Sequence, residues 1–386
     1  MTLSRDISRE EVDKPPLRVS MPLFSEPDIV EITARIGAVL RSGWLTSGSV
    51  VAEYERQFAN IVGTAYAVAL NSCTAALHCI MYLLGIGPGS EVVVPANTFA
   101  STANAVLYVG ARPVFADCDS TTFNVTAETI EERIGPKTRA VLVVHIGGNP
   151  CDMDEIIPLC KKKNLFLIED CAHALGSRYH NRQCGTFGAA GAFSFYPTKL
   201  ITSGEGGMIA TDLQRVGSDA KTFRNVGREY FGRTPITMLG YNYRMTDIHA
   251  CVGINQLRRL DEFVARRGEL AKIYDTQLRT IDWLKPQHID NASTSSYYAY
   301  ICRVSDGAPL SRDELSEVLK RESIETTVMF RPVYSHPYYR SQLSGVICPN
   351  AEMIGKESIV LPLHVGMRDE DVVRVVEVLR HVAPKR

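Results

Sequence analysis

Hydrophobic and polar positions along the middle of this chain alternate between short apolar runs and stretches of helical length, such as 127–134 and 153–162. The apolar runs lie at 65–70, 91–95, 113–116, 140–144, 165–168, 191–196 and 207–211. Strands that are apolar on both faces and spaced by helices indicate a mostly parallel central sheet flanked by helices. Binding sites in such sheets lie beyond the carboxyl ends of the strands.

The pattern differs at the two ends of the chain. An amphipathic helix is expected to begin after an N-cap at Ser25 and to end at Gly43. Beyond about residue 260 the pattern predicts a smaller α+β unit. Its expected elements are a charged helix at 256–274, a strand at 297–304, and helices at 312–321 and 369–382. We therefore expect a flexible leader of residues 1–22, a large domain of residues 23–260 and a small C-terminal domain of residues 261–386.

Composition narrows the function classes. The chain has 386 residues and a formal net charge of -1, so no general attraction to nucleic acid or anionic membrane is expected. No apolar run approaches the roughly 18 residues of a membrane span. The ten cysteines are scattered without a Cys-x-x-Cys pair, and the N-terminus lacks an apolar signal, which favours a reducing cytoplasm. His145, His173 and His180 do not show metal-ligand spacing, so no metal site is expected.

Lys199 carries the most informative chemistry, because it lies in a turn-rich segment soon after Asp170, which follows a buried strand. A lysine held in a crowded turn can bind an aldehyde cofactor as a Schiff base. A carboxylate at the end of a buried strand can keep the pyridine nitrogen of that cofactor protonated. Enzymes that use pyridoxal 5'-phosphate (PLP) need this pair, so we expect Lys199 and Asp170 to be catalytic. The alternative is a solvated loop lysine and an aspartate that caps a helix.

Three polar residues are candidates for holding the phosphate of such a cofactor. The strand at 65–70 runs into a helix whose first N–H groups, at Cys73 and Thr74, would point at an anion. Ser194, five residues before Lys199, can add a hydroxyl from the adjoining strand. In isolation, the 71–77 segment is better explained as an ordinary N-capped helix.

Three more residues could contact the cofactor ring. Phe99 follows the carboxyl end of a strand, where an aromatic ring can lie flat on a pyridine. Ala172 is small enough to lie against the other face, and His173 could bind the phenolic oxygen of the cofactor or a substrate group. Taken alone, Phe99 is better explained as core and His173 as a structural histidine.

A series of motifs in a characteristic order connects these residues. They read SGWLTSG at 42–48, TAAL at 74–77, VPANTF at 94–99, GARPVF at 110–115, HIGG at 145–148, EDCAHA at 169–174, FSFYPTK at 193–199, GEGG at 204–207 and GYNYRM at 240–245. From about Phe24 to its end, the chain resembles the DegT/StrS-type sugar aminotransferases, a branch of the fold-type-I PLP-dependent transferases.

The resemblance implies roles for these residues and for one more. Lys199 matches the lysine that binds PLP, and Asp170 matches the partner of the pyridine nitrogen. Cys73, Thr74 and Ser194 match phosphate contacts. Phe99 takes the place of the aromatic residue stacked on the cofactor ring, and His173 fills a position where the family carries His or Gln near the cofactor oxygen. Asn242 matches an asparagine that reaches the phosphate of the partner subunit's cofactor, which implies a homodimer with shared active sites.

The implied reaction moves an amino group from an amino acid, expected to be glutamate, through pyridoxamine phosphate to a keto sugar. The expected acceptor is a nucleotide-linked 4-keto or 3-keto-6-deoxy sugar, in amino-sugar biosynthesis. Arg331 and His336 are candidate substrate contacts, although a solvated surface cluster explains them equally well. Residues 324–336, which contain both candidates, depart from the family pattern at Thr327 and Tyr334. This departure leaves the nucleotide contacts open.

Three other functions stay open at this point. One is a PLP enzyme of the same fold with different chemistry, such as amino transfer to a keto-cyclitol or sugar dehydration. Another is a non-catalytic regulatory protein with the PLP fold. The third, a phosphate-binding module without PLP, does not explain a strand carboxylate paired with a turn lysine.

Overall fold

A seven-stranded sheet forms the centre of the computed structural model, which describes residues 16–229, 234–342 and 345–382. The strand order is β1 (Tyr66–Leu70), β9 (Gly207–Thr211), β8 (Ala190–Ser194), β5 (Phe166–Asp170), β4 (Thr138–Val144), β2 (Glu91–Pro95) and β3 (Arg112–Ala116). All these strands run parallel except β9, which is antiparallel to both of its neighbours. The expected mostly parallel sheet of an α/β fold is confirmed.

The antiparallel direction of β9 follows from the short connection that precedes it. Residues 195–206 join β8 to β9 without a helix, and a parallel return would need a longer crossover. The start of β9 therefore lies at the same sheet edge as the carboxyl ends of β1, β5 and β8. Lys199 lies in this connection, so strand order alone brings it to that edge.

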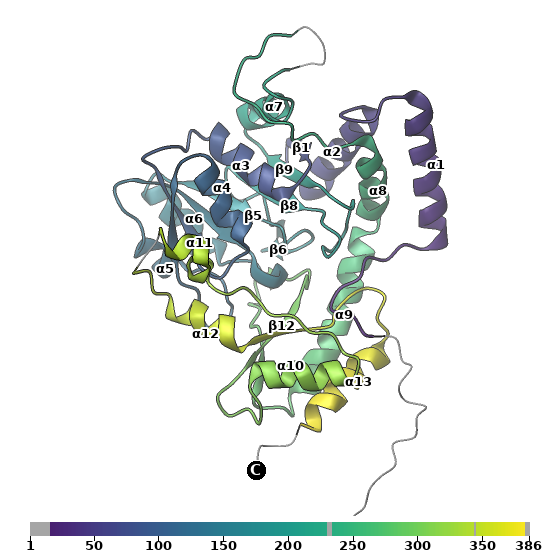
Figure 1. Cartoon of the computed structure of the whole chain (residues 1–386), viewed down its shortest axis with the longest axis vertical. Helices are drawn as coiled ribbons and strands as arrows, with labels where there is room; N and C mark the ends of the chain where they lie inside the picture. The colour runs from purple at the N-terminus through teal and green to yellow at the C-terminus, as the bar shows by residue number, and fades with distance from the viewer. Residues whose placement is uncertain (1–15, 230–233, 343–344, 383–386) are drawn as a thin grey trace, which may run out of the picture.

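Helices cover both faces of the sheet, as Figure 1 shows. On one face, α3 (Cys73–Leu83), α4 (Ala100–Tyr108) and α7 (Gln214–Phe223) contribute to a core that includes Leu77 and Phe223. On the other face, α2 (Ser49–Val62) and α8 (Asp247–Arg258) bury aromatic residues such as Phe58 against Phe193 of β8. The short α5 (Ala127–Glu131) and α6 (Met153–Lys162) close a further cluster beside β4 and β5.

A second, antiparallel sheet lies below the first in Figure 1. It contains β10 (Leu284–Pro286), β12 (Tyr300–Val304) and β13 (Ser358–Leu361), and it shares a core with α9 (Leu260–Leu278), α10 (Arg312–Arg321) and α13 (Asp369–Arg380). The remaining elements are the short sheet β11 (Ser293–Thr294), β6 (Arg178–Tyr179) and β7 (Arg182–Gln183), and the helices α11 (Pro337–Arg340) and α12 (Pro349–Glu357). The expected domain division at 260/261 stays a prediction.

The single charged helix expected at 256–274 is wrong. The chain forms α8 up to Arg258 and α9 from Leu260, and Arg259 between them leaves helical geometry with φ -96° and ψ 6°. The Arg259 guanidinium bonds to Asp28 at 2.6 Å and to Glu262, which stabilises the junction. The break lets α8 contact α1 and α2 while α9 contacts α13. Each of the two helices can therefore turn its own apolar face toward a different core.

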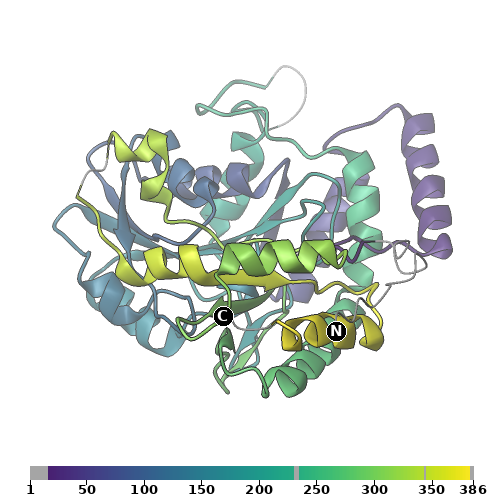
Figure 2. The ribbon, with the colours of Figure 1, turned by 60° about the horizontal axis from the view of Figure 1, so that its bottom comes forward.

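The N-terminal helix forms as the sequence predicts. In α1 (Glu26–Ser42) the Ser25 hydroxyl accepts a hydrogen bond from the Asp28 amide, and Gly43 ends the helix with φ 69°. Both ribbon views place α1 at the edge of the molecule, where it contacts α8 (Figures 1 and 2). Most of the expected leader lies outside the described residues. The last part of the expected leader is bound to the segment after α10, because Leu17 exchanges backbone hydrogen bonds with Ser323 and Glu325.

Two further features bear on the sequence-based expectations. Within the described ranges, every helix is too short or too polar to span a lipid bilayer. All ten cysteines are buried free thiols, which agrees with their interpretation as small core residues.

Candidate active site

A cavity of about 460 Å³ lies at the sheet edge where the strands end. Its walls come from the start of α3, the end of β5, the connection between β8 and β9, and the segment before β12. The predicted residues that line it are Cys73, Thr74, Phe99, Asp170, Ala172, His173, Ser194 and Lys199. The tertiary structure therefore brings together groups that are spread over more than a hundred positions in the sequence.

Lys199 is partly buried and reaches across the cavity to Tyr298. Its Nζ atom donates a hydrogen bond to the Tyr298 hydroxyl at 3.5 Å and lies 4.5 Å from the centre of that ring. The Lys199 amide donates to the Tyr196 carbonyl at 2.9 Å, which stabilises the turn that presents the side chain. The amine therefore has a defined position from which it can bind or release a proton.

Asp170 is buried at the carboxyl end of β5 and accepts hydrogen bonds from Thr102, Ala172 and, at 4.0 Å, the Cys73 thiol. The Thr102 hydroxyl donates to Oδ2 at 2.9 Å, and the Ala172 amide donates to Oδ1 at 3.1 Å. Burial raises the pKa of the Asp170 carboxyl above its ordinary value, although these hydrogen bonds and the charge of Lys199 oppose the shift. A cation placed next to this carboxylate would relieve the cost of burying its charge.

The start of α3 forms an anion cradle. Ser72 caps the helix by accepting from the Ala75 amide at 3.1 Å, while the amides of Cys73 and Thr74 have no acceptor among the residues that the structure describes. Gly207 packs directly under this turn, and a Cβ there would overlap the backbone of Ser72 and Cys73. Burial raises the pKa of the Cys73 thiol, so this residue offers its amide and a neutral side chain.

Aromatic side chains line another part of the cavity. The His173 ring stacks on Tyr298 with centroids 4.1 Å apart, and the Phe330 ring lies 5.8 Å from His173 and 5.9 Å from Phe99. Burial and the charge of Lys199 hold the pKa of His173 well below its usual range, so the imidazole is neutral. Since Nδ1 accepts from the Gly147 amide at 3.4 Å, Nε2 carries the hydrogen and can donate it.

Three predicted site residues do not line this cavity. Asn242 is exposed and lies outside it, beside Asn225, to which its backbone is bridged. Arg331 and His336 are also exposed, and the neighbouring Phe330 is the side chain that reaches the cavity. The roles of these three residues, like those of the lining residues, stay predictions.

The structure adds residues that sequence reasoning missed. Thr102 contacts Asp170, and its own hydroxyl lies 2.8 Å from that of Thr98. The signal available for this pair was two threonines four positions apart, of which Thr98 precedes α4 and Thr102 lies in its first turn. Tyr298 is about a hundred positions from Lys199 in the sequence, and no local pattern marked it.

His145, Glu169 and Cys171 form a compact buried group behind the cavity, with their ligand atoms within 4.8 Å of one another. The Glu169 carboxylate already accepts hydrogen bonds from the amides of residues 185, 187 and 188. The Nδ1 atom of His145 accepts from the Cys151 amide, so its Nε2 donates to Glu169 at 3.2 Å. These bonds satisfy the carboxylate and brace the end of β5, next to Asp170.

The residues of the cavity fit PLP. The cradle at α3 has two free amides for a phosphate, and Lys199 offers an amine for an aldehyde. Among the described residues Asp170 has no ion-pair partner within 4 Å, so a pyridine nitrogen could take that place. These three groups surround one cavity, as one small cofactor requires.

Comparison with known proteins agrees with this chemistry. A model of the DegT/DnrJ/EryC1/StrS aminotransferase family matches residues 28–380. The chain is 38% identical to the spore coat polysaccharide biosynthesis protein SpsC of Bacillus subtilis, over 95% of this chain and 97% of SpsC. It is 36% identical to the GDP-perosamine synthase of Caulobacter vibrioides, over 88% of this chain and 92% of that protein.

Solved structures extend the likeness to the whole fold. A Streptococcus pneumoniae protein described as a sugar aminotransferase is known in a form with pyridoxamine phosphate and in a form with PLP. The first superimposes with a TM-score of 0.88 at 30% identity, covering 95% of this chain and 97% of that one. The chain therefore belongs to the DegT/DnrJ/EryC1/StrS family and is a PLP-dependent aminotransferase of the sugar aminotransferase type.

Proposed function

We propose that the protein transfers an amino group from L-glutamate to the keto carbon of a nucleotide-linked 4-keto or 3-keto-6-deoxy sugar, in amino-sugar biosynthesis. The observation that carries the proposal is that Lys199 and Asp170 line one cavity together with the anion cradle of α3. The similarity to a GDP-perosamine synthase supports a nucleotide-linked acceptor.

The residues of the cavity divide the chemistry among them. PLP, when bound, supplies a cationic ring that withdraws electrons from the carbon that loses or gains the amino group. Asp170 would stabilise the positive ring nitrogen, and the amides of Cys73 and Thr74 would bind the phosphate. Lys199 would hold the aldehyde end through Nζ and would then carry a proton on that atom as general acid and base. The neutral His173 ring, whose Nδ1 accepts from the Gly147 amide, would donate a hydrogen bond from Nε2 to the cofactor or a substrate group.

The open side of the cavity supports a long acceptor. Phe99 and Tyr196 line the cavity and yet are 60% and 48% exposed. A sugar near Lys199 could therefore be joined to a nucleotide that extends toward the surface, and the exposed aromatic rings offer surfaces on which sugar or base can stack.

A turnover screen tests the acceptor. The purified enzyme is incubated with glutamate and with dTDP-, UDP- or GDP-linked 4-keto and 3-keto-6-deoxy sugars, and released 2-oxoglutarate is measured. Amino transfer to at least one nucleotide-linked sugar is expected. Amino transfer only to free keto-cyclitols such as scyllo-inosose would overturn the proposed acceptor class while leaving the aminotransferase assignment intact.

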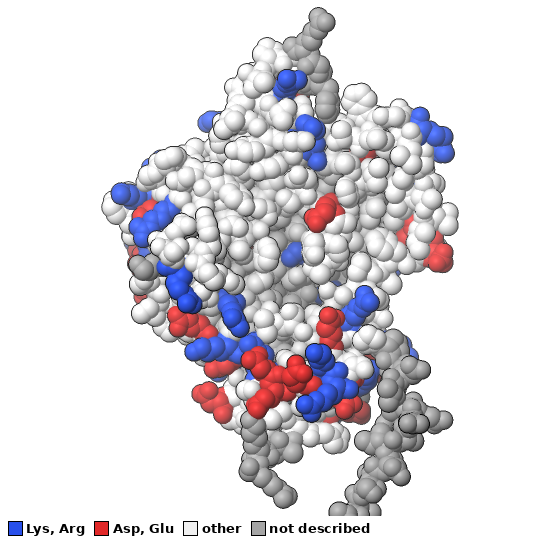
Figure 3. Space-filling view, in the orientation of Figure 1, with Lys and Arg blue, Asp and Glu red and all other residues white. Residues whose placement is uncertain are grey.

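A shared active site between two copies of the chain is part of this proposal. The face shown in Figure 3 is largely uncharged over α3, α4, α7 and α8, whereas charged side chains gather near α10 and α13. Exposed apolar residues include Leu45, Ile236 and Leu239, at 45%, 64% and 66%. Apolar surface of this kind is typical of protein interfaces, and it supports a homodimer in which Asn242 reaches the partner's cofactor.

Complementation between two inactive variants tests the shared site. We expect Lys199→Ala and Asn242→Lys each to have little activity, and their mixture to regain about a quarter of wild-type activity if subunits exchange at random. Only one site of each mixed dimer then has both native residues. An inactive mixture, with exchange verified by mass spectrometry of the intact dimer, would show that Asn242 does not act across the subunit interface.

A further inference from the structure

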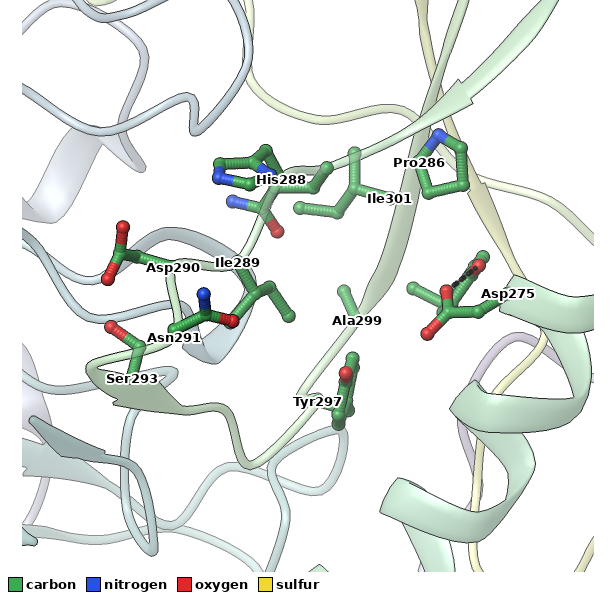
Figure 4. A pocket seen from close by; sticks show the side chains of 12 residues that line it. Asp275, Pro286, His288, Ile289, Asp290, Asn291, Ser293, Tyr297, Ala299 and Ile301 are labelled. Carbon is green, nitrogen blue, oxygen red and sulfur yellow. Dashed lines mark hydrogen bonds between the residues drawn. The ribbon is translucent and has the colours of Figure 1, made fainter. Parts of the chain in front are cut away.

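Tyr298 lies in the segment before β12, which separates two cavities, and it faces Lys199. A second cavity of about 500 Å³ lies on the other side of this segment and is lined by Tyr297, Ala299 and Asp275, as Figure 4 shows. Tyr298, between the first two, lines the cavity that holds Lys199. Tyr297 and Ala299 line the second cavity and Tyr298 lines the first, so the backbone of this segment directs Tyr298 toward the lysine.

The backbone at Tyr297 and Tyr298 has a strained conformation and is bound by a buried arginine. Tyr297 has φ 49°, a left-handed conformation that is uncommon for an aromatic residue and costs on the order of 1 kcal/mol or more. The buried guanidinium of Arg267 donates to the carbonyls of Tyr297 and Tyr298 at 2.7 and 2.6 Å. A strained residue clamped by a buried arginine indicates that the position of the following side chain matters.

The Tyr298 side chain is set among polar and aromatic partners. Its hydroxyl accepts from Nζ of Lys199 at 3.5 Å and lies 3.5 Å from the Thr198 hydroxyl, while its ring stacks on His173. The Lys199 ammonium also lies 4.5 Å from the ring centre, within the range of a cation–π contact. One side chain thus offers the free lysine both a hydrogen-bond acceptor and a π face.

The electrostatics of the phenol agree with this placement. Burial raises the pKa of Tyr298, but the charge of Lys199, the hydrogen bonds with Thr198 and Lys199, and the charge of Arg267 outweigh it, so the net pKa is below the ordinary value. Burial lowers the pKa of Arg267 to about 10, which still leaves this arginine charged at neutral pH. The direction of this shift reflects the positive groups that surround the phenol oxygen, Lys199 among them.

We propose that Tyr298 is a positioning residue that holds the ε-ammonium group of Lys199 whenever this amine is free during turnover. The inference rests on the proposed role of Lys199 as general acid and base. Tyr298 keeps the amine within reach of the reacting carbon and limits its motion, which lowers the entropic cost of each proton transfer. Its contact is with Lys199, so it should affect proton transfer more than substrate binding.

Two variants separate the hydrogen bond from the ring, and a third is the matched control. Tyr298→Phe keeps the ring and removes the hydroxyl, whereas Tyr298→Leu removes both contacts. Tyr300→Phe, two residues along, removes a hydroxyl that bonds to Asp275 at 2.6 Å, away from Lys199. We expect kcat to fall about 10-fold in Tyr298→Phe and several-fold further in Tyr298→Leu, with KM little changed, and to stay within about twofold in Tyr300→Phe.

A measurement on the cofactor-free protein tests the contact without any substrate. The rate at which trinitrobenzenesulfonate labels Lys199 is followed by peptide mass spectrometry at one fixed pH. Because the ring and hydroxyl of Tyr298 contact the amine and shield it from the reagent, labelling should be several-fold faster in Tyr298→Leu than in the wild type, and unchanged in Tyr300→Phe. This readout is independent of which sugar the enzyme accepts, so it distinguishes failure of this inference from failure of the proposed function.

The labelling rate and kcat, taken together, decide whether Tyr298 positions Lys199. Faster labelling together with a lower kcat and a larger isotope effect from α-deuterated glutamate supports the positioning role. A lower kcat with unchanged labelling overturns it, because Tyr298 would then act on something other than Lys199. Unchanged kcat and labelling in both Tyr298 variants overturn it as well. If Tyr298→Leu fails to fold, Tyr298→Phe, which keeps the shape of the side chain, decides the question.

Discussion

The Thr102 hydroxyl donates a hydrogen bond to Oδ2 of Asp170 at 2.9 Å, from a helix that begins only after β2 to a carboxylate that ends β5. Thr102 is fully buried, and its hydroxyl also contacts that of Thr98. Thr102 in the first turn of α4, itself bonded to Thr98 before the helix, therefore supports the carboxylate that is proposed to stabilise the cofactor ring.

Thr102→Val should lower activity without disturbing the fold, because valine has nearly the shape of threonine but cannot donate. Loss of a hydrogen bond to a charged group costs about 1.5–3 kcal/mol, so kcat should fall about 10-fold or more. Steady-state kinetics and cofactor titration measure the effect. Thr102→Ser keeps the hydroxyl and should retain most of the activity. Equal losses in both variants would show that the methyl group, not the hydroxyl, is what matters.

Lys199→Ala should abolish turnover and still bind pyridoxamine phosphate, because the phosphate cradle and Asp170 remain in place. Turnover is measured by release of the oxoacid, and binding by isothermal titration. Lys163→Ala serves as a control, since Lys163 pairs with Glu131 and neither residue lines the cavity. Residual turnover near the wild-type rate in Lys199→Ala would refute the catalytic assignment.

Gly207→Ala should weaken both stability and cofactor binding. The added methyl group would overlap the backbone of Ser72 and Cys73 at the start of α3, at a cost of about 1–3 kcal/mol. Thermal unfolding and titration with PLP measure the two effects. Gly268→Ala is the matched control, because its Cβ would meet no atom within 4 Å and alanine favours helix, so it should be neutral or slightly stabilising. Unaltered PLP affinity in Gly207→Ala would argue against a phosphate site at this turn.

His364 should make the fold sensitive to mild acid. Burial and the nearby charge of Arg267 lower its pKa to about 4, and its Nδ1 has no hydrogen-bond partner among the described residues. The unfolded chain, with an ordinary histidine pKa of about 6.5, binds a proton between pH 6.5 and 4 while the folded chain does not. Stability should therefore fall as the pH drops through this window, by on the order of 2 kcal/mol.

Urea unfolding at pH 7 and at pH 5 measures this contribution. The loss of unfolding free energy between the two values should be smaller in His364→Leu than in the wild type, whatever the stability of the variant at pH 7. His381→Gln, at an exposed position near the end of α13, should leave the difference unchanged. If His364→Leu shows the full wild-type loss, other groups account for the acid sensitivity.

The sequence by itself determined the class of fold and most of the residues around the cavity. Runs such as 140–144, apolar on both faces, specify buried parallel strands locally, and caps such as Ser25 and Gly43 specify a helix from a few neighbouring residues. The strand ends then place Asp170 and Ser194 at one edge, because parallel strands end on the same side. Lys199 joins them because its connection is too short for a crossover.

Contacts between distant segments were decided only by the tertiary structure. The break at Arg259 depends on its ion pair with Asp28, which lies over two hundred positions away. Thr102 and Tyr298 reach Asp170 and Lys199 through the packing of separate elements, and Phe330 rather than Arg331 turns to the cavity. Local patterns encode periodicity and turns, whereas the direction of a single side chain depends on the sum of packing around it.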